Sequence, residues 1–371
     1  MAVTEIQAKS LLRCRSRVDS WFVSDCGMNL YRGCQHDCSY CDGRAEKYHV
    51  AGTFGRDVAV KVNAVDVLQA EIQRRRRKPR GYVMLGGGVG DSYQPVERRY
   101  QVTRGVLALL AKQELPVHVL TKSTLVERDI DLLRRIHEQR GVIVSMSFSS
   151  VDDGIAAVFE PGVPPPGERL RTLRSFKQMD IPCGMFLLPV IPFVTDTEDM
   201  VERSVAAASA TGLDFVVFGG LTLKNGRQKT HFFEVLQRHQ PDLVERYEDI
   251  YTGDTWGNAA GEYYDRINQR FDAAACRYRM AKRVPADLYR DILPDDDLAV
   301  VMLDQLGYLA KLKHKPAPYG YAAHAISKLK KPLSSFDDLT NIPGVGPTTA
   351  RLVREMLDSR RCQYYEQLLW E

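Results

Sequence analysis

Between residues 21 and 226, short apolar segments alternate with longer amphipathic ones, and this alternation limits the fold more than any other feature of the sequence. Strands are predicted near residues 21–23 and at 82–85, 117–120, 141–148, 183–190 and 215–218, and helices at 64–76, 96–112, 126–139, 168–179 and 196–211. Strictly alternating strands and helices form right-handed β–α–β units around a parallel sheet. Six such units are fewer than the eight of a closed barrel. We therefore predict an α/β fold with a partial TIM-like (β/α)6 barrel, whose functional side chains lie on the loops after the strands.

Four regions are predicted along the 371 residues. Residues 1–20 form an N-terminal extension, 21–226 the barrel, 227–318 a helical extension in which the strand pattern fades, and 319–371 a small basic unit. The apolar content of 44% is that of an ordinary globular protein, and the net charge of +4 is too small to indicate an acidic partner by itself. Without an apolar run long enough for a membrane helix or a signal-peptide core, the chain is predicted to be cytoplasmic and to have no membrane partner.

Three of the eight cysteines, Cys34, Cys38 and Cys41, lie within eight residues with the spacing CxxxCxxC. This clustering indicates a metal site in a reducing compartment. Three thiolates on one loop can each bind a different iron of a [4Fe–4S] cluster and leave the fourth iron without a protein ligand. That iron is then free for a chelating ligand, such as the amino and carboxylate groups of S-adenosylmethionine.

Structural zinc is the alternative for this loop. Zinc normally takes four Cys or His ligands in two spaced pairs, and the sequence has no second CxxC pair. Cys26 or His36 is a possible fourth ligand. We interpret Cys26 as structural, while Cys14, Cys276 and Cys362 are isolated and indicate no second cluster.

At these residues the sequence resembles the radical S-adenosylmethionine (SAM) superfamily, whose signature is the CxxxCxxC spacing. More narrowly, it resembles the spore photoproduct lyase-like branch over residues 21–225. The matching motifs are Asn29-x-Tyr31-Arg32-Gly33-Cys34, Asp91-x-Tyr93-Gln94-Pro95-x-Glu97, Thr121-Lys122-Ser123 with Arg128-Asp129, and Glu160-Pro161 with Arg169-Leu170.

The resemblance implies a barrel of the radical SAM type. It also implies radical chemistry from which the protein must exclude water. The reduced cluster would cleave SAM to methionine and a 5′-deoxyadenosyl radical, which takes a hydrogen atom from the substrate. It also implies a reductant of the flavodoxin or ferredoxin type. The oligomeric state does not follow from the sequence.

The cofactor pocket is expected at the strand ends. Tyr40, just before the third cysteine, occupies the position that usually packs against the adenine in this superfamily. Glycines after the second strand occupy the place of the segment that receives the methionine amino group, because their backbone can come close to a ligand. Lys122 is a candidate partner for the methionine carboxylate. Two serines on one face of the fourth strand are further hydrogen-bonding candidates. These glycines and serines are Gly86, Gly87, Gly88, Ser145 and Ser147.

The hydrogen-atom donor is the main departure from the resemblance. Spore photoproduct lyase has a cysteine just after its second strand, whereas residues 84–90 of this chain contain none. Tyr93 and Cys183 are the candidate replacements. The alternatives are a packed phenol and a buried, inert thiol.

The C-terminal unit resembles a helix–hairpin–helix motif of DNA repair proteins, centred on Ile342-Pro343-Gly344-Val345-Gly346. A hairpin with two glycines can present backbone N–H groups and a helix N-terminus to a phosphate. Residues 305–336 contain six lysines and no acidic residue, including Lys328, Lys330 and Lys331. Such a stretch suits a nucleic acid backbone, although the same hairpin can serve only to pack helices.

We therefore predict a radical SAM enzyme that acts on a nucleic acid lesion or modification, with DNA favoured over RNA. Two alternatives stay open. One is a tailoring enzyme for a nucleoside or another small molecule, in which the hairpin unit only packs. The other is a DNA-binding protein with a structural or redox-sensing cluster.

Overall fold

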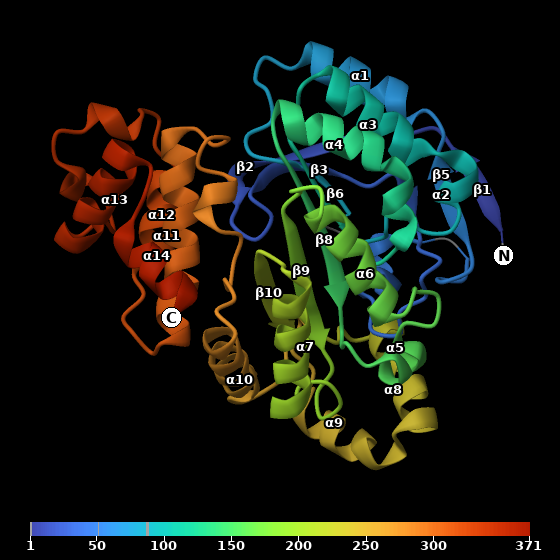
Figure 1. Ribbon diagram of the computed structural model, residues 1–371. Coiled ribbons are helices and arrows are strands. Elements are labelled where there is room, and N and C mark those ends of the chain that lie inside the picture. The colour runs from blue at the N-terminus through green and yellow to red at the C-terminus, as the bar shows by residue number, and fades with distance from the viewer. Residues whose placement is uncertain (1, 51, 87–88) are drawn as a thin grey trace.

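Segments of three to eight residues form a curled seven-stranded sheet in the computed structural model, which describes residues 2–50, 52–86 and 89–371 (Figure 1). The strand order is β10-β9-β8-β7-β6-β3-β2, and every pair from β3 to β10 is parallel. The predicted α/β fold with a partial barrel is confirmed. The strands are β2 (Leu12–Asp19), β3 (Ser24–Met28), β6 (Val83–Leu85), β7 (Val117–Thr121), β8 (Val142–Phe148), β9 (Cys183–Val190) and β10 (Phe215–Gly220).

Helices cover one face of this sheet. Side chains along a strand alternate between its two faces, so every second residue of a strand packs against these helices. Val83, Val119 and Val144 belong to a core shared with these helices. The helices are α1 (Ala64–Arg74), α3 (Val102–Lys112), α4 (Ile130–Gln139), α6 (Pro166–Lys177) and α7 (Glu198–Thr211). The helix predicted at 96–112 is divided at Gln101, whose φ of 51° separates α2 (Glu97–Tyr100) from α3.

The N-terminal part differs from the prediction. The strand expected near residues 21–23 lies at β3 instead, and the extension contains β2, an edge strand antiparallel to β3. A second sheet, of order β1-β5-β4, was also not predicted. Its strands β1 (Val3–Ile6), β4 (Tyr31–Arg32) and β5 (Val58–Lys61) are too short to give a clear alternating pattern. Cys26, which we interpreted as structural, forms a disulfide between β3 and β2 with Cys14, which we had interpreted as isolated.

The residues after the barrel are helical, as predicted. Figure 1 shows α11 to α14 beside β2, away from α5 (Asp153–Phe159) and α8. These C-terminal helices are α8 (Arg227–His239), α9 (Val244–Ile250), α10 (Tyr263–Arg277), α11 (Asp295–Leu312), α12 (Tyr319–Ile326), α13 (Pro347–Ser359) and α14 (Gln363–Trp370). None of the helices in the described part of the chain has the length and apolarity needed to cross a bilayer.

A second core joins the C-terminal unit to the inner face of the barrel. Ile143, Phe186 and Val217 from the strands belong to one buried cluster with Leu306 of α11 and Leu352 of α13. Because this cluster is continuous, the base of the barrel and residues 319–371 bury the same apolar surface.

We expect the substitution Leu352→Ala to destabilise the barrel and the C-terminal unit together. Leu352 is 2% exposed, and truncating a buried leucine to alanine costs about 2–5 kcal/mol of unfolding free energy. Chemical denaturation followed by circular dichroism and tryptophan fluorescence should give coincident transitions, both shifted in the variant. The exposed Arg351→Ala serves as the matched control. A separate early transition confined to the C-terminal unit would contradict the shared core.

Candidate active site

A cavity of about 340 Å³ opens at the carboxyl ends of the parallel strands. The loop after β3 contributes the cysteines, the ends of β6 and β7 contribute Gly86 and Lys122, and the opposite wall is formed by β8, β9 and the segment after β10. The lining residues are Phe22, Cys34, His36, Cys38, Tyr40, Cys41, Asp42, Gly86, Val89, Gly90, Asp91, Leu120, Thr121, Lys122, Ser147, Leu188, Pro189, Gly220, Leu221 and Thr222. The cavity lies where the resemblance placed the cofactor.

The three clustered cysteines all line this cavity as free thiols. Burial raises the pKa of all three, so they are protonated until a metal displaces the protons. Within the described ranges, no three His, Cys, Asp or Glu side chains converge on one point where a single ion would be held. The CxxxCxxC spacing of these thiols in the sequence suits a cluster in which each cysteine binds a different iron.

Neither residue proposed to complete a zinc site is free to do so. Cys26 is in the disulfide with Cys14. Nδ1 of His36 lies 2.9 Å from the Gly162 carbonyl, and Nε2 lies 3.2 Å from an oxygen of the Asp91 carboxylate. A zinc ion would have to displace Asp91 from Nε2 to gain His36 as its fourth ligand.

A buried carboxylate ties the cysteine loop to the strands. Glu160 is 1% exposed, and its oxygens lie 2.7 Å from Arg169 and 3.0 Å from the Lys122 ammonium. The Tyr40 hydroxyl also donates to it. Burial by itself would raise the pKa of Glu160, but Arg169 and Lys122 outweigh burial and hold this pKa well below its usual range. The carboxylate stays ionised and holds Tyr40 of the cysteine loop against Lys122 of β7.

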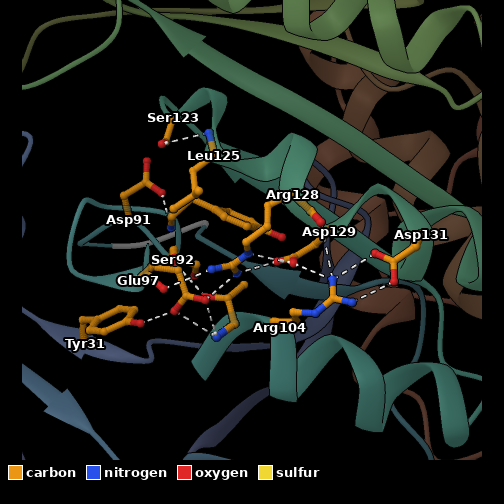
Figure 2. A network of polar contacts seen from close by, with 12 residues as sticks. Tyr31, Asp91, Ser92, Glu97, Arg104, Ser123, Leu125, Arg128, Asp129 and Asp131 are labelled. Carbon is orange, nitrogen blue, oxygen red and sulfur yellow. Dashed lines mark hydrogen bonds and ion pairs between the residues drawn. The ribbon is translucent and has the colours of Figure 1, made fainter. Parts of the chain in front are cut away.

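A second polar network fixes the loops after β6 and β7 (Figure 2). Glu97 accepts from the Arg128 guanidinium at 2.7 Å and from the Tyr31 hydroxyl. Asp129 bonds the same arginine, also at 2.7 Å, and Arg104 at 2.9 Å. These residues belong to the motifs that carry the family resemblance, and here they hold the structure together.

Asp91 joins this network to the cavity. Its carboxylate accepts from the Tyr93 amide at 2.8 Å, the Thr121 hydroxyl at 2.7 Å and the Lys122 amide at 2.8 Å. Burial opposes the ionised form, but His36 and these donors lower the pKa of Asp91. Asp91 thus fixes the backbone at Lys122.

Gly86 meets the requirement for close backbone approach. Its φ is +89°, and a Cβ at this position would overlap the Leu120 carbonyl oxygen. Only glycine fits here, and Gly86 lines the cavity. Gly87 and Gly88 lie outside the described residues.

Lys122 and Ser147 also line the cavity, but Ser145 does not. The Lys122 ammonium lies 3.1 Å from the Ser147 hydroxyl, so these two predicted residues are in contact. Ser145 lies two residues before Ser147 on β8, further from the cavity. It is fully buried there, and its hydroxyl lies 2.8 Å from Nε2 of His118. The face that Ser145 and Ser147 share runs from the cavity into the core.

Neither predicted hydrogen donor lies at the cavity. Tyr93 is fully buried among the motif residues, and its hydroxyl is near the Asp129 carboxylate without a hydrogen bond of normal geometry. Cys183 opens β9, whereas the cavity lies at the other end of the strands, and its thiol lies 3.4 Å from the Ile181 carbonyl. For both residues the structure favours the alternatives of a packed phenol and an inert thiol.

The predicted nucleic acid residues lie in the C-terminal unit, away from the cavity lining. Gly344 has a φ of +82° and lies against the Tyr321 ring, so a side chain there would clash. Gly346 precedes α13 and faces open space. Lys328, Lys330 and Lys331 are exposed.

Glu160 and Arg169 were quoted as motif positions without a role, and Asp91 and His36 were not assigned to the polar contacts that they make around the cavity. Glu160, Arg169 and Asp91 have side chains that are buried or nearly so, and His36 is 2% exposed. One signal was available in the sequence. Glu160 stands directly before Pro161, and a residue before proline rarely continues a helix. The charge therefore falls on a loop at the end of α5.

Comparisons with known proteins agree with this geometry. A family model described as the radical SAM superfamily matches residues 28–222, just over half of the chain. An uncharacterized protein of Mycobacterium tuberculosis is 31% identical over 258 residues, covering 68% of this chain and 74% of the relative. An uncharacterized protein of Methanocaldococcus jannaschii is 29% identical over 219 residues, covering 59% of this chain and 77% of the relative.

Among solved structures, spore photoproduct lyase complexed with dinucleoside spore photoproduct superposes with a TM-score of 0.57 and 14% identity, covering 74% of this chain and 79% of the lyase. At this identity the likeness shows a common fold.

We expect acid to destabilise the protein through His118. Burial lowers the pKa of this histidine to about 4, so between about pH 6.5 and 4 the unfolded chain binds a proton that the folded chain does not. Stability is then complete above this window and falls as the pH is lowered through it. Going from about pH 7 to about pH 5 should cost about 2 kcal/mol of unfolding free energy.

The measurement is urea denaturation at both pH values. His118→Gln should remove this part of the pH dependence, and the exposed His239→Gln should retain it. An unchanged pH dependence in His118→Gln would contradict the assignment.

Proposed function

Because this chain belongs to the radical SAM superfamily, we propose that Cys34, Cys38 and Cys41 hold a [4Fe–4S] cluster and that SAM binds in the adjoining cavity. The observation that carries this proposal is the position of three free thiols on a cavity at the carboxyl ends of a parallel sheet. When bound and reduced, the cluster supplies the electron that cleaves SAM to methionine and a 5′-deoxyadenosyl radical.

The cavity residues then bind and shield the cofactor. Lys122 and Ser147 offer donors for the methionine carboxylate, and the Gly86 backbone can approach the amino group. The Tyr40 ring, 5% exposed and held through Glu160, is placed to pack against the adenine. Leu188, Pro189 and Leu221 make the opposite wall apolar, which excludes water from the radical.

For the substrate we propose a nucleic acid carrying a lesion or a modification, with DNA favoured over RNA. Spore photoproduct lyase, which shares the fold, is complexed with a dinucleoside photoproduct. In this chain the open backbone at Gly346 and the exposed Lys328, Lys330 and Lys331 support contact with phosphates.

One observation favours a second candidate, a tailoring enzyme for a nucleoside or another small molecule. The hairpin residues Leu339, Ile342 and Val345 are buried in the core that the C-terminal unit shares with the barrel base. A hairpin used only for packing would have this burial.

Anaerobically prepared protein should contain about four irons and show a change in its reduced-state EPR spectrum when SAM is added. Alanine at Cys34, Cys38 or Cys41 should abolish both, while Cys183→Ala, the matched control, should leave both intact because Cys183 lies far from the cavity. Reduced wild-type protein should also release 5′-deoxyadenosine. Stoichiometric zinc in place of iron would refute the cluster.

The hairpin unit can be tested without deleting it, since deletion would expose the shared core. We expect the triple replacement of Lys328, Lys330 and Lys331 by Gln to weaken DNA binding and to lower the salt slope by roughly 0.9 per lost duplex contact or 0.7 on single strands. Gly346→Ala should weaken binding as well, because its Cβ would fill the open space before α13.

The measurement is fluorescence anisotropy with labelled single- and double-stranded DNA over a range of salt concentrations. A control triple, with Gln at the exposed Lys9, Lys47 and Lys112, matches the loss of charge. If the wild-type protein ignores both forms of DNA at ~50 mM salt, where backbone contacts are strong, the hairpin is a packing element.

A further inference from the structure

A second hollow, of about 300 Å³, lies outside the cofactor cavity between the loop after β9 and the helices α9 and α10. Arg246 of α9 and Arg266 and Arg270 of α10 line it, together with Tyr263 and Asp196. Positions 263, 266 and 270 are three and four residues apart, so they share one face of α10. The hollow therefore collects three guanidinium groups from two helices.

These positive charges are not neutralised within the protein. Arg270 donates to the backbone carbonyl of Asp196 at 2.5 Å, and Arg246 stacks on the Phe193 ring at 3.8 Å. Across the ranges that the structure describes, none of the three arginines forms a salt bridge, and the exposed Arg266 side chain has no hydrogen bond, ion pair or ring contact. Against three positive charges the lining carries one carboxyl group, Asp196, whose pKa is raised by burial. Like charges at i and i+4, as at 266 and 270, destabilise a helix unless something neutralises them.

A buried hydroxyl in the same hollow is only weakly partnered. Tyr263 is 2% exposed; its hydroxyl makes no hydrogen bond of normal geometry with a described residue, and the Asp196 carboxyl group is its polar neighbour in the hollow. Leaving a buried polar group unpaired costs about 1–3 kcal/mol, so such groups are rare without a ligand or water to satisfy them. The phenol is a donor that an oxyanion would accept.

The hollow adjoins the rim of the cofactor cavity. It begins at Phe193, three residues beyond β9, and Leu188 and Pro189 of that strand line the cavity. On the other side, the Tyr264 hydroxyl donates at 2.9 Å to the carbonyl of Leu221, another cavity residue. The two sites are therefore linked by β9 and by the segment after β10, although no described residue lines both of them.

We propose that this hollow is a phosphate-binding subsite in which Arg246, Arg266 and Arg270 and the Tyr263 hydroxyl hold a phosphate group of the substrate. Guanidinium groups match phosphate oxygens in a bidentate geometry, and the phenol adds one more donor. The volume exceeds that of a phosphate ion, so the sugar or base attached to it also has room. The assignment of this phosphate group to the substrate rests on the proposed function. The phosphate belongs either to a free mononucleotide or to the backbone of a nucleic acid strand.

The test is isothermal titration calorimetry with inorganic phosphate, a deoxynucleoside 5′-monophosphate and a short single-stranded oligodeoxynucleotide. All three should bind the wild-type protein. Arg266→Gln, which removes a side chain without hydrogen bonds, ion pairs or ring contacts, should weaken each by about tenfold or more, and Arg246→Gln should do the same. Tyr263→Phe keeps the ring and removes only the hydroxyl, so it should weaken binding without unfolding the protein. Arg238→Gln on α8, exposed and outside the hollow, should have no effect.

The three probes also distinguish the source of the phosphate. A strand that binds more tightly than the mononucleotide, with a steep salt dependence, identifies a nucleic acid backbone. Equal affinities identify a free nucleotide. Absence of phosphate binding to the wild-type protein, or equal affinities for the variants and Arg238→Gln, would overturn the subsite.

Release of 5′-deoxyadenosine is measured separately and without substrate. The subsite variants should retain it, because none of these residues lines the cofactor cavity. Loss of the cluster chemistry in wild-type protein would refute the proposed function and leave the phosphate measurements standing.

Discussion

The arrangement of the site depends on one interaction, the burial of the Glu160 carboxylate between Arg169 and Lys122. Removing a carboxylate from water costs several kcal/mol and is sustained only when opposite charges and hydrogen bonds replace the lost solvation. Here the replacements come from α6, from the end of β7 and, through Tyr40, from the cysteine loop. The loop has little regular secondary structure, yet it is anchored at Tyr40 to two rigid elements. The thiols on either side of Tyr40 therefore have fixed positions before any metal binds.

A second lesson concerns the motifs that carry the family resemblance. Most of the conspicuous charges after β6 and β7, such as Glu97, Arg128 and Asp129, bond to one another and lie outside the cavity lining. They fix the positions of the two loops relative to each other, and Asp91 fixes the backbone of Lys122 by accepting a hydrogen bond from its amide. A sequence signature of this kind identifies an architecture and a cofactor more firmly than it identifies a substrate. Residues that discriminate between substrates are then expected outside these motifs, for example on α9 and α10.

The barrel strands and the three cysteines were predictable because both are local patterns. β-Branched and aromatic runs mark β7 to β10, and the cysteine spacing is contained in eight residues. The edge strand β2 was missed because four of its eight residues are exposed and three are arginines, so it lacks an apolar run. The sequence also could not predict how far along a strand a residue lies from the cavity. Period two placed Ser145 and Ser147 on one face, but only the fold decides which of them reaches the cavity. Likewise, Cys183 was assigned to the correct strand, but it lies at the start of β9, whereas the cavity is at the carboxyl end.

The core that α11 shares with the inner face of the barrel has a consequence for how the molecule engages a long ligand. When two binding modules are joined by a flexible linker, the effective concentration of the second module varies smoothly with linker length. Here the strands and the C-terminal helices share one buried core in the described part of the chain, so the distance between them is fixed. For the nucleic acid proposed as substrate, a strand long enough to reach both the cavity and the C-terminal unit would gain avidity from both contacts, and a shorter strand would gain none. Selection by length would then follow from the rigidity of the fold, without a contact that recognises length.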